Sequence, residues 1–275
     1  MPESMQERHI KRDLYFEEQA YTTVTYVIPF IFGSMGIRPG TRVLEIGCGE
    51  GGNLRPFLEA GCDVTGVDIL VEKIKNAENF FRDHPNKDRL KLIAGDIYDV
   101  GEKLTEQFDL VYMRDVIEHI HDQERFLGFA GKFLKNGARF FLGFPPWQNP
   151  FGGHQQVCRS KFLSRLPYFH LLPGSFYPRI LKLFREPPGL ITDLLEIRDT
   201  GISIERFRRI IIKENYIIEK EVFYLFNPNY EIKFGLKPQI QTRLISGIPG
   251  LRNFLITSCY YLLSKNINHN NITGI

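Results

Sequence analysis

The stretch Thr41-Arg-Val-Leu-Glu-Ile-Gly-Cys-Gly-Glu-Gly-Gly52 decides the fold. Within it, Val43, Leu44 and Ile46 make an apolar run long enough for one buried strand of a parallel sheet. Glycines then stand at positions 47, 49, 51 and 52, and apolar residues recur at helical spacing over positions 54–58. A strand, a glycine turn and a helix place free backbone N–H groups at the strand's carboxyl end, where glycine lets a ligand approach. The stretch therefore predicts a site for a nucleotide-type cofactor.

The glycines alone do not identify that cofactor. Gly47-x-Gly49-x-x-Gly52 fits the dinucleotide fingerprint, and Asp68 lies at about the distance expected of the ribose-binding acid. However, Glu45 stands two residues before the first glycine, a position that the dinucleotide pattern does not specify. Positions 64–68 and 90–96 then read as two further strands that each end in an aspartate, and positions 108–112 read as a fourth strand.

Four motifs follow one another at intervals of one strand and one helix: VLEIGCGEGG, VTGVDI, AGDIYD and FDLVYMRDVIEHI. With them the sequence resembles the class I S-adenosylmethionine (SAM)-dependent methyltransferases, in particular the group of ubiquinone/menaquinone and small-molecule C- and O-methyltransferases. The resemblance covers the first half of the chain closely and the last part in outline. It implies an α/β, Rossmann-like, doubly wound sheet of seven mostly parallel strands. An antiparallel C-terminal strand, an N-terminal helix and a cap inserted after the fifth strand complete the expected fold.

The resemblance also implies roles for ten cofactor-binding residues: Glu45, Gly47, Cys48, Gly49, Asp68, Ile69, Asp96, Ile97, Arg114 and Asp115. Asp68 would accept from both ribose hydroxyls and Asp96 from the adenine amine, with the two isoleucines flanking the ring. Glu45 and the backbone of residues 47–49 would line the methionine end of SAM, near Arg114 and Asp115. The alternative role of each aspartate is a helix cap after a strand. Two such aspartates at strand ends beside one glycine turn favour binding.

Two histidines are candidate catalytic bases. His119 follows Asp115 by one helical turn, so a carboxylate could support its imidazole. Structural support of the turn is the alternative role. His154 lies in Gly152-Gly-His154-Gln155-Gln156, whose mixed donors and acceptors suit recognition of a hydroxyl or carbonyl. Its alternative role is a loop anchor. We expect no metal site, because no second histidine stands near His154 in the sequence.

The chain divides into four expected parts: an N-terminal helical segment (1–40), the SAM-binding core (41–147), a cap (148–200) and the C-terminal part of the core (201–275). Residues 11–33 keep one apolar helical stripe. By the resemblance Tyr15 or Tyr21 of this helix would lie near the cofactor, and the alternative, which ordinary burial behaviour favours, is a role in the core or at the surface. The cap is rich in proline and apolar residues, with seven basic and four acidic residues, which suits a bulky acceptor carrying an anionic group. Positions 216–226 and 253–263 read as the last two strands.

Composition limits the partners and the compartment. The 275 residues carry a net charge of +3, too small to indicate a nucleic-acid partner. The four cysteines lack metal-type spacing, residues 1–8 lack the apolar core of a signal peptide, and no apolar run is long enough for a transmembrane segment. We therefore expect a cytoplasmic protein; the sequence leaves its oligomeric state open.

The predicted function is transfer of a methyl group from SAM to an oxygen or carbon of a small-molecule or lipid-linked acceptor. Two alternatives remain. An NAD-dependent oxidoreductase would need a Tyr-x-x-x-Lys or comparable hydride-transfer constellation, and none stands out in the sequence. A SAM-binding protein with a regulatory or structural role would bind SAM without turnover.

Overall fold

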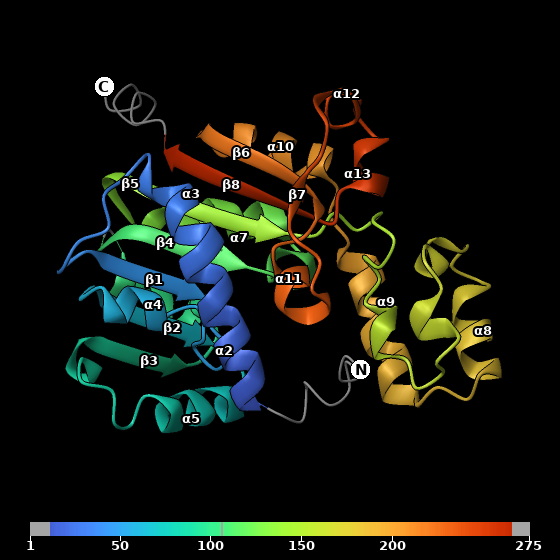
Figure 1. The fold of residues 1–275 in the computed structure, drawn as a ribbon, viewed down its shortest axis with the longest axis horizontal. Coiled ribbons are helices and arrows are strands. Elements are labelled where there is room, and N and C mark those ends of the chain that lie inside the picture. The colour runs from blue at the N-terminus through green and yellow to red at the C-terminus, as the bar shows by residue number, and fades with distance from the viewer. Residues whose placement is uncertain (1–11, 106, 266–275) are drawn as a thin grey trace.

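The computed structural model describes residues 12–105 and 107–265. Its centre is an eight-stranded sheet in the order β3-β2-β1-β4-β5-β8-β6-β7 (Figure 1). The strands are β1 (Arg42–Ile46), β2 (Asp63–Asp68), β3 (Leu90–Ala94), β4 (Phe108–Arg114), β5 (Leu134–Phe144), β6 (Tyr216–Phe226), β7 (Gln239–Ile240) and β8 (Ser258–Lys265). The first five are parallel to one another, and β8 is antiparallel to its neighbours β5 and β6. The doubly wound sheet and its antiparallel C-terminal strand are thus confirmed.

The predicted number of seven strands is one too few. The additional strand is β7, a two-residue edge strand that pairs with β6. A strand this short has no alternation of apolar and polar residues to reveal it in the sequence. The last strand also begins later than predicted, at Ser258, because Arg252–Leu255 form the short helix α13.

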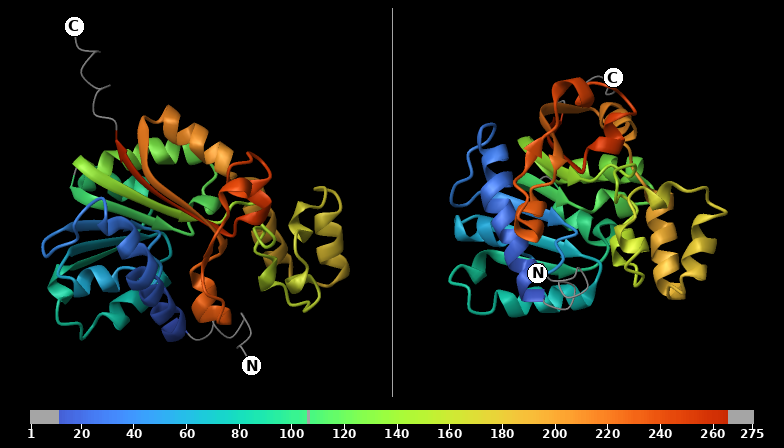
Figure 2. Two further views of the ribbon diagram at one scale, coloured as in Figure 1. Left: turned by 45° about the horizontal axis from the view of Figure 1, so that its top comes forward. Right: turned by 45° about the vertical axis from the view of Figure 1, so that its right-hand side comes forward.

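Helices cover both faces of the sheet, as two further views show (Figure 2). One face packs against α4 (Arg55–Glu59) and α5 (Val71–Phe80), together with the N-terminal helices. The other packs against α6 (Ile97–Val100), α7 (Gln123–Ala130) and α10 (Ile204–Lys213). Each face has its own hydrophobic cluster, so the strands between them are buried on both sides, which is the usual situation in parallel sheets.

The sequence predicts helix caps at Asp122 and Ser203, each a short polar residue directly before an amphipathic stretch, and both caps are present. The Asp122 carboxylate accepts from the Arg125 N–H at 3.1 Å at the start of α7. The Ser203 hydroxyl accepts from the Arg206 N–H at 3.1 Å at the start of α10. Each satisfies a backbone donor that has no partner within its helix.

The predicted N-terminal helix is present, with an irregular middle. It consists of α2 (Arg12–Thr22), one π-helical turn (Thr23–Val27) and α3 (Ile28–Phe32); residue 11 lies outside the described part of the chain. Pro29 in the first turn of α3 has no N–H to donate to the preceding turn, which explains the change of helix type.

The connection between β6 and β7 lies against this N-terminal helix. It contains α11 (Asn229–Phe234), which packs on α2 (Figure 1). The hydroxyls of Tyr21 and Tyr26 both donate to Glu231 Oε2, at 3.1 and 2.5 Å. A segment near the C-terminus is therefore fixed to the N-terminal helix beside the carboxyl ends of the strands.

Residues 148–200 form a lobe beyond the carboxyl ends of the strands (Figure 1). It contains α8 (Tyr177–Leu183), α9 (Pro188–Thr200) and three short 3₁₀ turns, and it has its own hydrophobic cluster that includes Leu163, Phe169 and Tyr177. The lobe is fastened at its base, where the Trp147 N–H donates to the Ile202 carbonyl at 2.8 Å. Whether it closes over a bound cofactor stays a prediction.

Candidate active site

The glycine turn after β1 is built by backbone geometry. Gly47 and Gly49 have φ of +73° and +57°, in the left-handed region that favours glycine. A Cβ atom on Gly47 would lie 2.6 Å from Val116 Cγ2, whereas one on Gly49 would meet nothing closer than the Lys73 side chain at 3.9 Å. The turn is therefore packed against the protein at its first glycine and open at its second, which leaves room for a ligand.

Asp68, at the end of β2, holds this turn in place. Its carboxylate accepts from the Gly49 N–H at 2.8 Å and from the Leu70 N–H at 2.9 Å, and the residue is 7% exposed. A carboxylate oxygen accepts more than one hydrogen bond, so each retains capacity for a ligand hydroxyl. The helix-cap role that the sequence left open for Asp68 is not observed, because Leu70 is the N-cap of α5 and this helix has no side-chain cap. Asp68 anchors the glycine turn instead, which orients its carboxylate beside the open side of the turn.

Asp96 has a corresponding position one strand further along. β2 and β3 are neighbours in the sheet, with Asp68 paired to Ala94, so the two aspartates follow adjacent strand ends. Asp96 caps α6 by accepting from the Tyr98 N–H at 2.9 Å. Of the two isoleucines expected beside a ring, Ile69 is 65% exposed, whereas Ile97 is 8% exposed and packs in the core.

Glu45 is fully buried in β1. One carboxylate oxygen accepts from Asn53 Nδ2 at 2.7 Å, and the other has no hydrogen-bond partner among the described residues. Burial, opposed by the hydrogen bond from Asn53 and the nearby Arg114, raises the pKa of Glu45 to about 8. A carboxyl held in this way is neutral at neutral pH and ionises when a cation approaches it.

Arg114 ends β4 and is 6% exposed. Its Nε lies 3.8 Å from an Asp115 carboxylate oxygen, and its Nη1 has no hydrogen-bond partner within the described ranges. It lines a small pocket together with residues of α2 and α11. That pocket is lined by Tyr15, Glu18, Gln19, Thr22, Arg114, Asn229, Ile232 and Lys233.

Burial and the charge of Asp115 raise the pKa of Tyr15 to about 12, so its hydroxyl is a donor at neutral pH. Tyr21, the other aromatic candidate, is 41% exposed and binds Glu231 instead.

The segment after β4 does not form the helical turn expected between Asp115 and His119. Asp115 has φ of +57°, with its N–H donating to the Gly143 carbonyl at 2.8 Å, and only Ile117–His119 form a 3₁₀ turn. No Asp115–His119 hydrogen bond forms in the described part of the chain. A non-glycine residue in this backbone region is strained, and such strain concentrates at functional sites.

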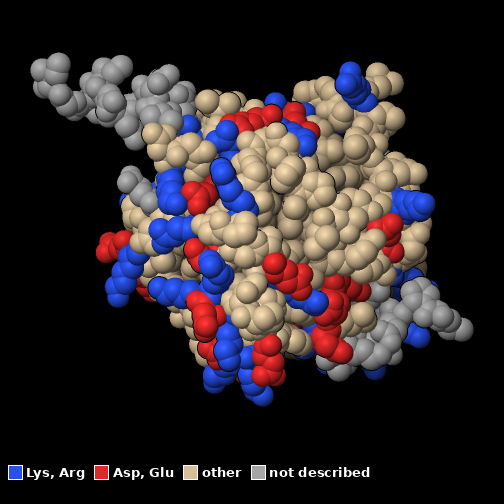
Figure 3. Space-filling view, turned by 60° about the vertical axis from the view of Figure 1, so that its left-hand side comes forward, with Lys and Arg blue, Asp and Glu red and all other residues tan. Residues whose placement is uncertain are grey.

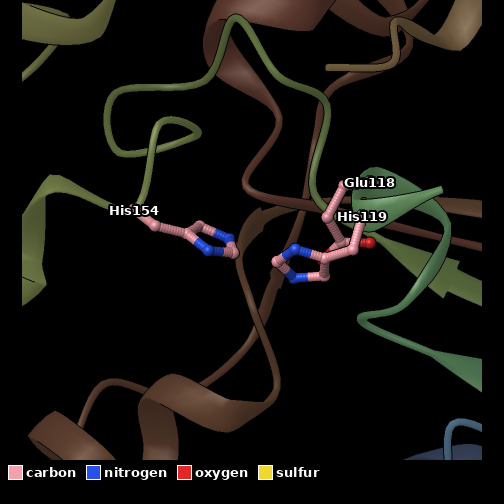
Figure 4. A group of neighbouring side chains, drawn as sticks. All are labelled: Glu118, His119 and His154. Atoms are coloured by element: carbon pink, nitrogen blue, oxygen red, sulfur yellow. The ribbon is translucent and has the colours of Figure 1, made fainter. Parts of the chain in front are cut away.

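His119 instead faces His154 from the inserted lobe. The centroids of the two imidazole rings are 5.2 Å apart (Figure 4). Ligand-type atoms of Glu118, His119 and His154 lie within 4.8 Å of one another. The sequence-based argument against a metal used the absence of a partner for His154; folding supplies that partner from 35 positions earlier in the chain. Gln155, in contrast, anchors the loop by donating to the Pro150 and Leu166 carbonyls at 3.0 and 3.2 Å.

Two site residues were missed from the sequence. Glu118 belongs to the motif around β4, but only burial distinguishes it from an ordinary surface glutamate; it is 3% exposed, and neither carboxylate oxygen has a partner in residues 12–105 and 107–265. Asn53 directly follows the glycine run and binds Glu45. An amide one residue after the last glycine was the available signal.

Comparisons with known proteins agree with this geometry. A family described as a methyltransferase domain matches residues 16–164. The human mitochondrial ubiquinone biosynthesis O-methyltransferase is 33% identical over 104 residues, which cover 38% of this chain and 28% of that protein. Its counterpart from Maricaulis maris is 36% identical over 113 residues, 39% of this chain and 42% of that protein. A sterol 24-C-methyltransferase of Gibberella zeae is 30% identical over 112 residues, 40% and 29% respectively. The matches thus span less than half of these relatives.

Solved structures share the fold. Geranyl diphosphate methyltransferase in complex with SAM superposes with a TM-score of 0.56 at 14% identity, covering 87% of this chain and 84% of that one. Phosphoethanolamine N-methyltransferase 2 of Haemonchus contortus in complex with SAM gives a TM-score of 0.57 at 16% identity, covering 92% and 56%. The family match over more than half of the chain, carried on this fold, excludes the oxidoreductase alternative. The chain belongs to the class I S-adenosylmethionine-dependent methyltransferases.

Proposed function

We propose that this chain transfers a methyl group from SAM to an oxygen or carbon of a small-molecule or lipid-linked acceptor. One observation carries the proposal: three carboxylates lie on neighbouring strands around a glycine turn that is open at Gly49. Glu45 is the second-last residue of β1, Asp68 ends β2, and Asp96 follows β3. Hydroxyls, an amine and an ammonium group are the groups that such carboxylates bind. The buried Glu45 oxygen that lacks a partner is the part of this site most in need of a cationic ligand.

The residues fit SAM as follows. Asp68 and Asp96 hold the nucleoside, and Ile69 lies exposed beside them. Glu45 and the backbone of residues 47–49 face the methionine end, close to Arg114 and Asp115. When bound, SAM supplies a methyl group activated by a positively charged sulfur. The chain's own contribution is positioning, because an in-line displacement depends on how the nucleophile is held.

The acceptor's proton is the second task of the site. His119 and His154 stand beside the end of β4, next to the expected methionine end. For a hydroxyl acceptor, we propose that one of these imidazoles accepts the hydroxyl proton as the oxygen is methylated. His154 belongs to the inserted lobe, so the same lobe that lines the acceptor space supplies a proton acceptor.

An apolar and basic surface supports a lipid-linked acceptor. The segment 227–257 exposes eight large apolar side chains: Ile232, Phe234, Leu236, Ile240, Leu244, Ile248, Leu251 and Phe254. It carries four basic residues and one acidic residue. Figure 3 shows a broad area with few charged side chains between the centre and the upper right of the view. Such a surface beside α11 suits an acceptor held at an anionic membrane surface.

We further propose a cytoplasmic location. All four cysteines are buried and unpaired, as expected in a reducing compartment. Within the described residues, the helices are all too short or too polar to cross a membrane.

Calorimetry and a transfer assay test this function. S-adenosylhomocysteine, the demethylated product, should bind with clear heat, and NADH should not. Incubation with methyl-labelled SAM and cell extract should then label a compound that partitions into organic solvent if the acceptor is lipid-linked, or into water if it is not. Binding of NADH alone would overturn the cofactor assignment. Tight product binding without transfer to any extract fraction would favour the regulatory alternative.

A further inference from the structure

We propose that Glu118, His119 and His154 form a binding site for one divalent transition-metal ion, of the zinc class, with a coordination position left open. The site lies next to the expected SAM site and uses none of the residues assigned to SAM. The inserted lobe completes the site, because it supplies His154, whereas Glu118 and His119 belong to the 3₁₀ turn that follows β4.

The geometry is the first argument. One ligand atom from each side chain lies within 4.8 Å of the other two. Two ligand atoms bound to the same zinc ion at about 2.0–2.2 Å lie no more than about 4.4 Å apart. A small rotation of the imidazole rings therefore brings all three onto a common ion, and Figure 4 shows the two rings pointing toward each other.

The buried carboxylate is the second, independent argument. Glu118 is 3% exposed, and both of its carboxylate oxygens lack a hydrogen-bond partner in the described ranges. A buried carboxylate without a partner is costly, and natural proteins retain one where it binds a cation or takes part in function. The other buried glutamate of the site, Glu45, has Asn53 as a partner. Glu118 has no such side-chain partner among the described residues.

Hydrogen bonds from neighbouring residues hold the segments that carry Glu118, His119 and His154 in place relative to one another. The Thr200 hydroxyl, at the end of the lobe, donates to the Glu118 carbonyl at 2.5 Å. Gln123 Nε2 bridges the carbonyls of Ile117 and Thr200 at 3.1 and 2.5 Å. At the other end of the lobe, the His154 N–H donates to the Phe151 carbonyl at 3.1 Å, with φ of +56° at His154. Metal ligands are typically held by such outer contacts.

The ligand set indicates the class of ion. Two imidazoles and one carboxylate suit zinc, iron or manganese, whereas calcium and magnesium prefer oxygen ligands alone. Three protein ligands leave a position for water or substrate, as in catalytic zinc sites. If the proposed methyl transfer is correct, the bound ion would replace a free imidazole in deprotonating the acceptor. A hydroxyl in the open position would lose its proton to solvent more readily, because the ion stabilises the resulting oxyanion. Only this catalytic role rests on the proposed function.

Metal binding is measured directly on the full chain, without SAM or acceptor. The chain is treated with chelator and titrated with Zn²⁺ by calorimetry, and with Co²⁺ by visible absorption, because zinc has no d–d spectrum. We expect one ion per chain. His119→Ala and His154→Ala should each weaken binding by at least about 10–100-fold, the scale already seen when an outer contact of a metal ligand is lost. His121→Ala is the matched control, since His121 is exposed and belongs to no such group.

Glu118→Gln provides a third variant that keeps the size of the side chain. It should fold, because it removes a buried charge, and it should weaken Zn²⁺ binding while leaving binding of S-adenosylhomocysteine intact. Absence of stoichiometric Zn²⁺ or Co²⁺ binding overturns the proposal. So does binding that the His119, His154 and Glu118 variants do not weaken. Because these experiments contain no methyl donor, failure of the methyl-transfer proposal would leave their outcome unchanged.

Discussion

Replacing Glu45 with glutamine should remove a pH dependence from the stability of the unliganded chain. The pKa of Glu45 is raised from 4.5 to about 8, mainly by burial, so the folded state holds its proton more tightly than the unfolded state does. Stability from this group is therefore fully present below pH 4.5 and is lost as the pH rises toward 8. At 1.36 kcal/mol per pKa unit, the loss between pH 5 and pH 8 amounts to about 3–4 kcal/mol.

The measurement is denaturant unfolding of the wild type and Glu45→Gln at several values between pH 5 and pH 8. The amide oxygen that this substitution introduces still accepts from Asn53, so the contact present in the wild type is kept. We expect the variant to be close to the wild type at pH 5 and more stable by about 3 kcal/mol at pH 8. Glu72→Gln, at an exposed glutamate, is the control and should show no such trend. A difference between Glu45→Gln and wild type that stays constant with pH would refute the assignment of a buried, neutral carboxyl.

Three further predictions concern ligand binding and the turn. Gly47→Ala should lower the unfolding temperature and weaken binding of S-adenosylhomocysteine, because its φ is +73° and the new Cβ would lie 2.6 Å from Val116. Gly137→Ala is the control: it has a similar φ of +77° but open space around the new Cβ, so it measures the cost of backbone strain without a steric clash. Asp68→Ala should weaken that binding by about 1.5–3 kcal/mol in calorimetry, the scale for losing a charged acceptor; normal affinity in the folded fraction would leave Asp68 as an anchor only. His154→Ala should leave product binding nearly unchanged and slow transfer by about 10²–10⁴-fold; an unchanged transfer rate would exclude His154 from the reaction.

The sheet was largely predictable because its signals are local. Each of the first four strands is an apolar run that ends at a glycine or an acid, and periodicity alone places such runs. The caps at Asp122 and Ser203 were equally visible, since a cap is decided within three residues. The two-residue strand β7 was not, because its only stabilisation is pairing with β6.

The site was less predictable because neither the burial of a side chain nor a contact between residues far apart in the sequence can be read from a local stretch of sequence. Nothing in the sequence distinguishes Glu118 from a solvent-exposed glutamate. Only the packed structure shows that the Glu118 carboxylate oxygens have no hydrogen-bond partner among the described residues. His119 and His154 meet because the lobe is held to the turn after β4 through Gln123 and Thr200. The spacing of Asp115 and His119 suggested a helical turn that a left-handed residue interrupts.

The single hydrogen bond between the Trp147 N–H and the Ile202 carbonyl has an evolutionary consequence. The backbone leaves the core after β5 and re-enters it just before α10 at nearly the same point. The 54 residues between these two positions therefore form an insertion that is closed at its base and has its own hydrophobic cluster. The entropic cost of closing such an insertion rises only slowly with its length. Exchange of this lobe would therefore leave the strands of the sheet as they are, and under the proposed function it would change the acceptor without changing the methyl donor.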